Sequence, residues 1–406
     1  MPSRRIVIIG GSLSGLIAGN LCHRMGWDVD IYERTSGVLD GRGAGITILP
    51  GLLETFRAAG VTEEFNAIEL PSRMVLDRAG HMVAEYTFAQ QMISWRRLYE
   101  MVNAVFPQER YHTGMTLQNI EQGADRVTAC FANGERIDAE LLIGADGSRS
   151  TLREHLLPEV KPYYPGYVAW RCLTDERQLA RATHKRLFDR YSLCLTPGEQ
   201  VIGYPVPGPN HSAAAGKRQY NVVWYHPVEA GKQLARLMTD DTGRHHPNGI
   251  PPALISEEVR RELVTSARSC LAPEFAQAIE RAKLVFFQPI VDVEVPRLVF
   301  GRVVLIGDAA FVARPHVAMG VPKAGGDAQV LVDSITQNGQ DLSSALSLFE
   351  QKRLRTGSAI VARGRYLGRY MEAQLKSPEE RQRAERAREP LRVMMETAAP
   401  TDYELL

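Results

Sequence analysis

The chain has 406 residues, of which 44% are hydrophobic and 23% are charged, as is usual for a globular protein, and this length favours two domains. Lysine and arginine number 48 and aspartate and glutamate 47, so no overall field attracts nucleic acid or an anionic membrane. No apolar run approaches the roughly 20 residues that span a bilayer. The five cysteines are scattered without a C-x-x-C pair, which indicates reduced thiols in a cytoplasmic protein.

Residues 5–33 are predicted to form a dinucleotide-binding βαβ unit, because a strand, a glycine turn, a helix, a second strand and an acidic residue follow in order. Gly10 allows the tight turn, and Gly15 lets the helix pack close to the strand. The unpaired amides at the helix start can hold a pyrophosphate, and Glu33 can accept from a ribose hydroxyl. Ser12 replaces the middle glycine of G-x-G-x-x-G, but its side chain can itself donate to a phosphate. The alternative is an ordinary turn without a ligand.

The composition changes near residue 161. From there to about 230, tyrosines and tryptophans lie in segments with strand-like alternation, separated by Pro-Gly pairs, which is typical of an antiparallel sheet and hence of a second domain. The charge-rich stretch 378–389 is expected to be a solvated helix without chemistry of its own. The expected division is a dinucleotide-binding domain of residues 1–70, 97–160 and 283–375, a substrate domain of residues 71–96 and 161–282, and a helical C-terminal tail of residues 376–406.

Two further apolar strands each run into a motif that pairs glycine with aspartate. The strand at 142–144 leads to Asp146, and the strand at 303–306 leads to Asp308. Ligands of open α/β sheets collect where such strands end, although Asp146 could equally cap the helix that follows it. Asp308 can accept from the polyol chain of a flavin. Gly320 is expected to begin a helix whose positive end stabilises negative charge on a reduced flavin ring.

The three motifs, in this order and at these separations, resemble the single-component flavoprotein aromatic hydroxylases of the p-hydroxybenzoate hydroxylase class. The resemblance runs from about residue 5 to 370. It implies an α/β fold with a Rossmann-like FAD-binding domain, an interleaved antiparallel-sheet substrate domain and a C-terminal helical segment. Several stretches are most similar to the pyridine hydroxylases of that class, which carry a serine in the same turn; these stretches are 10–12, 110–113, 166–171, 204–208 and 314–316.

The resemblance also implies the reaction. NADH or NADPH would reduce FAD, O2 would add to flavin C4a, and the resulting hydroperoxide would hydroxylate an electron-rich hydroxylated pyridine or related N-heterocycle. Such chemistry needs a closed apolar pocket, a ring held over the flavin edge and an acceptor for the substrate hydroxyl. The expected partners are therefore a small aromatic substrate, O2 and NAD(P)H, with no nucleic acid and no membrane. A homodimer is expected from the resemblance alone.

The site residues are expected in two groups. Tyr204 and His316 are the catalytic candidates, and His316 could either accept from the ring hydroxyl or only brace its turn. Trp224 and Tyr225 are further substrate-binding candidates that alternate along one strand, so at most one of them faces the pocket. The aromatic candidates could equally be sheet core, while His226 and Arg171 are weaker candidates. The expected FAD contacts are Gly10, Ser12, Gly15, Glu33, Ala44, Gly45, Asp146, Asp308, Pro315 and Gly320.

Several alternatives stay open. The same fold could hydroxylate a benzenoid phenol or a salicylate-like acid. A flavin oxidase or dehydrogenase is disfavoured by the paired aspartate motifs and the loop at Pro315. A nicotinamide-only dehydrogenase would leave Asp308 unexplained. No metal is expected, because His245 and His246 lie in a polar loop without a second ligand cluster at metal spacing. The sequence does not distinguish NADH from NADPH as the reductant.

Overall fold

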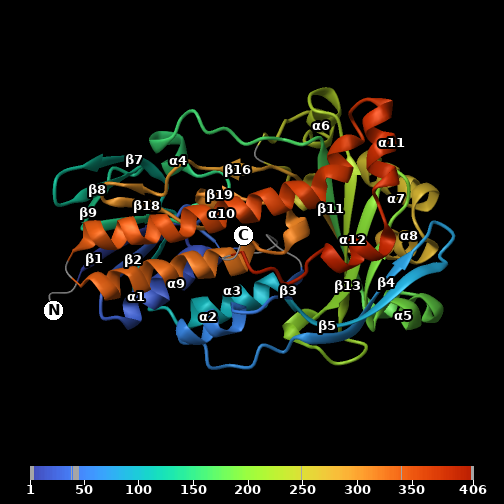
Figure 1. The fold of residues 1–406 in the computed structure, drawn as a ribbon, viewed down its shortest axis with the longest axis horizontal. Coiled ribbons are helices and arrows are strands. Elements are labelled where there is room, and N and C mark those ends of the chain that lie inside the picture. The colour runs from blue at the N-terminus through green and yellow to red at the C-terminus, as the bar shows by residue number, and fades with distance from the viewer. Residues whose placement is uncertain (1–3, 38, 40–44, 248, 340, 404–406) are drawn as a thin grey trace.

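The computed structural model describes residues 4–37, 39, 45–247, 249–339 and 341–403. It has two lobes, one built on a parallel sheet and the other on a largely antiparallel sheet (Figure 1). The long helix α10 (Leu342–Ala373) runs along both lobes. Among the described helices, none is long and apolar enough to cross a membrane.

The first lobe is built on a six-stranded sheet of order β17-β18-β10-β1-β2-β6, in which only the edge strand β17 is antiparallel. Ile9 lies beside Gly144, and Gly144 lies beside Leu305. The glycine turn after β1 and both aspartate motifs therefore lie together at the carboxyl ends of the parallel strands. The strands are β1 (Arg5–Ile9), β2 (Asp28–Glu33), β6 (Tyr111–Thr113), β10 (Leu141–Gly144), β17 (Val299–Phe300) and β18 (Val303–Leu305).

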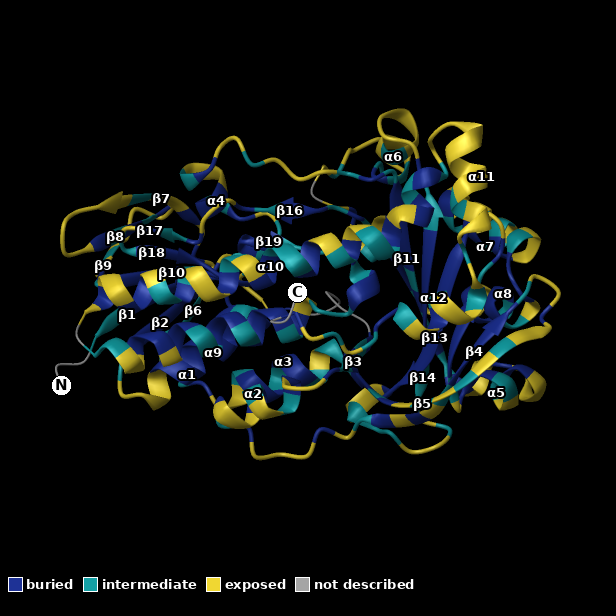
Figure 2. Ribbon diagram, in the orientation of Figure 1, coloured by how far each residue is buried: buried dark blue, intermediate teal, exposed yellow. Residues whose placement is uncertain are grey.

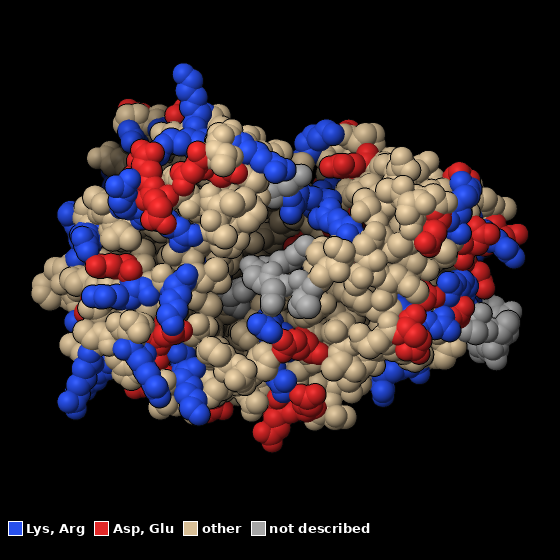
Figure 3. All heavy atoms as spheres, turned by 180° about the vertical axis from the view of Figure 1, so that it is seen from behind, with Lys and Arg blue, Asp and Glu red and all other residues tan. Residues whose placement is uncertain are grey.

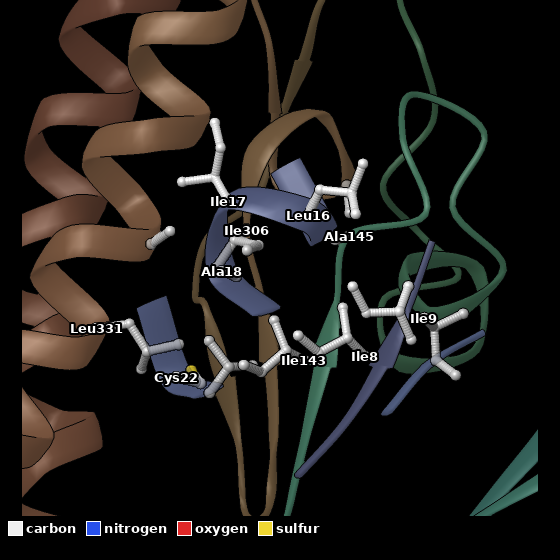
Figure 4. Close-up of a cluster of buried hydrophobic side chains, with 14 of the residues drawn as sticks. Ile8, Ile9, Leu16, Ile17, Ala18, Cys22, Ile143, Ala145, Ile306 and Leu331 are labelled. Carbon is white, nitrogen blue, oxygen red and sulfur yellow. The ribbon is translucent and has the colours of Figure 1, made fainter. Parts of the chain in front are cut away.

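Helix α1 (Leu13–Arg24) connects β1 to β2, which confirms the predicted βαβ unit. It is buried from Leu13 to Cys22 except at Ser14, and it packs between the sheet and α9 (Gly320–Asn338). Figure 4 shows its apolar side chains among Ile8, Ile143, Ile306 and Leu331. Each fully buried isoleucine or leucine contributes about 1.5–3 kcal/mol to the stability of this layer. The lobe also contains α2 (Leu52–Ala58), α3 (Trp95–Ala104), α4 (Thr151–Leu156), β7 (Leu117–Gln122), β8 (Val127–Phe131) and β9 (Arg136–Ala139).

The second lobe is built on an eight-stranded sheet of order β15-β11-β14-β13-β12-β4-β5-β3, antiparallel except between β12 and β4. Strands β3 (Gly45–Ile48) and β15 (Leu284–Pro289) belong to it, although they lie outside the expected bounds of 71–96 and 161–282. Helices cover one face, and the opposite face looks toward the first lobe. The other elements are β4 (Ile68–Leu76), β5 (Met82–Ser94), β11 (Tyr167–Asp175), β12 (Arg190–Cys194), β13 (Gln200–Val206), β14 (Gln219–Pro227), α5 (Arg181–Leu187), α6 (Lys232–Leu237), α7 (Glu257–Cys270) and α8 (Pro273–Glu280).

The C-terminal segment follows the expected solvated helix only in part. Helix α11 (Pro378–Arg386) has no buried residue and is largely exposed in Figure 2. Helix α12 (Pro390–Glu396) instead turns back onto the second lobe, where the buried Arg73 of β4 holds its end. Arg73 donates to the main-chain oxygens of Met394 at 2.7 Å, Thr397 at 2.6 Å and Ala398 at 3.0 Å. The last described residues therefore belong to the packed body of the protein.

Candidate active site

A cavity of about 400 Å³ lies between the two lobes, in the size range of small-molecule and cofactor sites. The space-filling view shows a hollow between them and charges of both signs scattered over this face (Figure 3). The first lobe contributes the turn after β1 and the start of α9, while the second contributes strands β11, β13, β14 and β15. One cavity thus joins the predicted cofactor motifs to the predicted substrate sheet.

The turn after β1 has the close backbone approach that the motif predicts. Gly10 has a φ of +107°, and a Cβ atom there would lie 2.3 Å from the main-chain oxygen of Ala145. A Cβ on Gly15 would lie 1.9 Å from the oxygen of Gly10. Only glycine fits at these two positions without moving backbone. Ser12 is the N-cap residue of α1 and lines the cavity, and its side chain caps no amide of the helix.

Glu33 is buried at the end of β2 and ties this turn to the sheet. Its carboxylate accepts from the amide of Gly11 at 2.8 Å and from the amide of Thr35 at 2.9 Å. A carboxylate offers about four acceptor positions, so two remain for a ribose hydroxyl. The geometry is compatible with the predicted ribose contact, which stays a prediction.

Two buried donors that have no hydrogen-bond partner in the described part of the chain lie at the cavity beside this turn. They are Ser14 Oγ, in the first turn of α1, and Lys323 Nζ, in the first turn of α9. Lys323 is 1% exposed, and its Nζ lies 3.6 Å from Oδ1 of Asp308, whose side chain is 47% exposed. Unpaired donors at two helix N-termini suit a diphosphate, and the Asp308 carboxylate suits a polyol. The residues present therefore fit FAD.

Asp146 supports the start of α4, as its alternative role in helix capping implies, although the N-cap residue of that helix is Ser150. Its Oδ2 accepts from the amide of Leu152 at the start of α4, at 3.2 Å, and burial raises the pKa of this carboxyl. The cavity is lined instead by the neighbouring Gly147 and Ser148. The structure thus shows no Asp146 carboxylate in the cavity lining, although the motif still shapes that lining through its backbone.

Buried charged side chains behind the motifs escaped the sequence reasoning. Arg153, 1% exposed, donates to the main-chain oxygens of Ser148 at 2.5 Å and Ala309 at 3.0 Å, which joins the two aspartate motifs. Asp327 of α9 accepts from the amide of Gly307 at 2.9 Å and from Arg353 Nε at 2.7 Å. Arg153 lies about two helical turns after Asp146 and could have been found from that spacing, whereas Asp327 lies 20 residues after Gly307 and has no such local signal.

The cavity side of the second lobe is an aromatic wall formed by Tyr204 and Tyr225. The Tyr204 hydroxyl donates to the main-chain oxygen of Gly45 at 3.0 Å, and its ring stacks on Tyr191 with centroids 5.3 Å apart. A Cβ on Gly45 would lie 2.2 Å from the Tyr204 ring, so this approach requires glycine. Burial raises the pKa of both Tyr204 and Tyr225, which keeps these phenols neutral.

Trp224 lies on the opposite face of β14. It is fully buried against the layer of helices, where its Nε1 donates to Glu199 Oε2 at 2.7 Å. The alternation along the strand is thus as predicted, and Tyr225 is the residue that faces the cavity. The expectation that Trp224 contacts substrate is corrected accordingly.

His316 lies behind the aromatic wall. It is 1% exposed, its Nε2 shares a hydrogen bond with the Tyr167 hydroxyl at 3.0 Å, and its ring lies 4.1 Å from that of Tyr225. Burial and the nearby Arg314 lower the pKa of His316 to about 3. His316 is absent from the cavity lining, whereas Pro315 and Val317 line it. This supports the bracing role and corrects the expectation of a catalytic, substrate-contacting imidazole.

Four of the remaining predicted FAD contacts line the cavity, and one lies outside the described residues. Gly45, Asp308, Pro315 and Gly320 all line the cavity. Ala44 lies outside the described residues. Among the described residues, no group of three or more histidine, cysteine, aspartate or glutamate side chains could hold a metal ion.

The fold and this cavity define a flavoprotein of the FAD-dependent monooxygenase class. Residues 4–162 match the family described as FAD binding domain, and residues 164–292 match the family described as FAD binding domain-like. These matches confirm the predicted FAD cofactor.

The class is confirmed by individual relatives. The chain is 34% identical over 364 residues to the 2,6-dihydroxypyridine 3-monooxygenase of Paenarthrobacter nicotinovorans, covering 88% of this chain and 89% of the relative. It is 27% identical over 375 residues to the 6-hydroxynicotinate 3-monooxygenase of Bordetella bronchiseptica, covering 88% and 89%. The chain therefore belongs to this family of FAD-dependent monooxygenases, and the predicted enzyme class is confirmed.

Two solved structures have the same fold as this chain. The 2,6-dihydroxypyridine-3-hydroxylase from Arthrobacter nicotinovorans superposes with a TM-score of 0.86 at 32% identity, over 91% of this chain and 93% of the other. Klebsiella pneumoniae HpxO complexed with FAD and uric acid superposes with a TM-score of 0.76 at 22% identity, over 96% and 95%, which is a likeness of fold. The predicted fold class is confirmed.

Proposed function

We propose that this monooxygenase uses NADH or NADPH and O2 to hydroxylate an electron-rich hydroxylated pyridine or a related N-heterocycle. The observation that carries the proposal is the single cavity that joins the turn of α1 to the wall of Tyr204 and Tyr225. The likeness to the 2,6-dihydroxypyridine and 6-hydroxynicotinate monooxygenases supports an N-heterocyclic substrate. A flat aromatic ring matches a wall of this kind in shape and polarity.

The residues around the cavity divide the work. The turn at residues 10–15, with Glu33 and Asp308, holds the cofactor, and Gly320 places the positive end of α9 beside it. When bound, FAD supplies the oxygen activation that no side chain offers. Tyr204 and Tyr225 position the substrate ring and exclude water. The neutral Tyr225 hydroxyl can donate a hydrogen bond without bringing a negative charge to the ring, whereas the Tyr204 hydroxyl already donates to the main-chain oxygen of Gly45.

The sharpest test is anaerobic stopped-flow reduction of the yellow protein by NADH and by NADPH, with and without 2,6-dihydroxypyridine. Faster reduction with the pyridine, followed after mixing with ¹⁸O2 by a product that contains one labelled oxygen, is the expected result. Reduction that ignores the pyridine and yields only hydrogen peroxide would overturn the proposal. Labelled product from a phenol or salicylate, with none from the pyridine, would move the substrate class to benzenoid rings.

We also propose a domain division and an oligomeric state. The first is the domain division, with an FAD-binding domain of 1–70, 97–160 and 283–375, a substrate domain of 71–96 and 161–282 and a tail of 376–406, apart from β3 and β15, which join the second sheet. The second is a homodimer, for which the family resemblance is the support. Sedimentation of the purified protein tests the second directly, since a single 45.2 kDa species would contradict it.

A further inference from the structure

The described residues that line the cavity include more cationic side chains than carboxylates. Among the described residues, its lining contains three cationic side chains, Arg171, Arg314 and Lys323, and one carboxylate, that of Asp308. Arg314 is neutralised by Asp292 at 2.9 Å and Glu372 at 2.8 Å, and Lys323 lies beside Asp308. Arg171 forms no ion pair with any carboxylate in the part of the chain that the structure describes. Within those described ranges, no carboxylate compensates its positive charge at the substrate end of the cavity.

The fold places Arg171 in the middle of the substrate sheet. On β11 it lies beside Val223 of β14 and Phe286 of β15, so its backbone is held from both sides. By strand alternation its side chain shares a face with Tyr167, on the side of the sheet that carries Tyr204 and Tyr225. Arg171, Tyr204 and Tyr225 all line the same cavity, where the charge of Arg171 lowers the pKa of both tyrosines against the larger effect of burial.

The Nε–H of Arg171 is buried and has no hydrogen-bond partner among the residues that the structure describes. A buried donor left unsatisfied costs about 1–3 kcal/mol, and more when the group is charged. Such a cost is offset when a bound ligand supplies an acceptor. An anionic acceptor offsets it best, because it also compensates the charge.

We propose that Arg171 binds the substrate as an anion, donating to the ionised ring oxygen of a hydroxylated N-heterocycle. The proposal rests on the proposed function and names the ionisation state that the site selects. A planar guanidinium can hold a planar heterocyclic anion through two parallel hydrogen bonds, which a lysine cannot. Loss of the hydroxyl proton makes the ring more electron-rich, as aromatic hydroxylation requires. The neutral tyrosines add no competing negative charge.

The test is a binding titration of the oxidised holoenzyme without reductant and without O2, so that no turnover occurs. 2,6-Dihydroxypyridine is added at a series of pH values spanning its ionisation, and flavin absorbance reports occupancy. For the wild type, affinity should rise as the free ligand ionises. In Arg171→Met the affinity for the anion should fall by about 30-fold or more, and the pH dependence should flatten. Neutral 2,6-dimethoxypyridine should lose less than about 3-fold.

Two further variants make the result specific. Arg171→Lys keeps the charge and should retain the rise in affinity with ligand ionisation. Arg190→Met removes a half-buried arginine of the same sheet that is absent from the cavity lining and pairs with Glu85 at 3.0 Å, and it should leave every titration unchanged. FAD content and the melting temperature of each variant report folding independently.

The proposal is overturned if wild-type affinity is indifferent to ligand ionisation, a result that needs no variant. It is also overturned if Arg171→Met binds the anion normally but shifts the flavin midpoint potential, because Arg171 would then serve the reduced flavin. If the wild type binds no pyridine but binds salicylate through Arg171, the anion site stands and the pyridine assignment fails. The two proposals can thus fail separately.

Discussion

Arg153 Nη1 donates to the main-chain oxygen of Ala309 at 3.0 Å, across 156 residues of sequence. The same guanidinium holds the oxygen of Ser148 from its Nη2. It thereby joins the loops that follow β10 and β18, both of which line the cavity. Desolvation lowers the pKa of Arg153, while the carboxylates of Asp146, Glu154 and Asp308 act in the opposite direction.

Arg153→Met should therefore separate the two loops. Removing the charge-assisted hydrogen bonds leaves buried carbonyl groups unsatisfied, and we expect the free energy of unfolding to fall by about 3 kcal/mol. FAD affinity should fall by about 10-fold or more, because both loops line the cavity that would hold the cofactor. Urea unfolding and a fluorescence titration with FAD measure the two effects. The exposed Arg126→Met is the control, and equal FAD affinities in the two variants would contradict the prediction.

His316 should make stability depend on pH. Its folded pKa of about 3 lies below the ordinary value of 6.5, so the unfolded chain binds the proton more readily. The stabilisation is fully present above pH 6.5 and is lost as the pH falls from 6.5 toward 3. At pH 5 the loss amounts to about 2 kcal/mol.

Urea unfolding at pH 8 and pH 5 checks this dependence. The wild type should lose about 2 kcal/mol more than His316→Gln between the two values, since only the wild type carries this buried imidazole. Parallel losses would show that another histidine dominates. Because the imidazole does not line the cavity, His316→Gln should also retain hydroxylation.

Trp224 and Tyr225 show which part of the site could be predicted from the sequence. Alternation along a strand requires that the two side chains face opposite ways, and that follows from local geometry alone. Which of them faces the cavity depends on where α7 and α8 pack, which is a tertiary matter. The turn from Gly10 to Gly15 was predictable for the converse reason, because strand, turn and helix adjoin in the sequence.

The C-terminal segment contains a contact that could not be predicted from the sequence. Its charge pattern predicted a solvated helix, which describes α11, but nothing in that pattern points to Arg73, more than 300 residues away. A buried arginine whose hydrogen bonds go to main-chain oxygens leaves no complementary acidic residue to be found in the sequence. Contacts of this kind become visible only in the folded chain.

Arg73→Met should accordingly release the end of α12. The variant removes three hydrogen bonds to main-chain oxygens and one to Gln90, and we expect a loss of about 3 kcal/mol in stability. Hydrogen exchange of residues 390–403 should accelerate more than that of β1, which is far from the change. Uniform acceleration across the chain would indicate global destabilisation instead. Arg190→Met again serves as the control.

Gly15→Ala provides the strictest test of the cofactor turn. The added methyl would lie 1.9 Å from the oxygen of Gly10, so α1 must move away from the end of β1. We expect about 100-fold weaker FAD binding and about 3 kcal/mol lower stability, because the shift disturbs both the diphosphate site and the buried face of α1.

Gly37→Ala is the matched control for this substitution, because Gly37 is exposed and a Cβ there meets nothing within 4 Å. FAD content after purification, followed by fluorescence titration of the apoprotein, compares the two variants. Normal FAD affinity in Gly15→Ala would mean that the turn can open without losing the cofactor. The diphosphate would then have to be held mainly by Ser14 and Lys323, whose buried donors lie beside the turn.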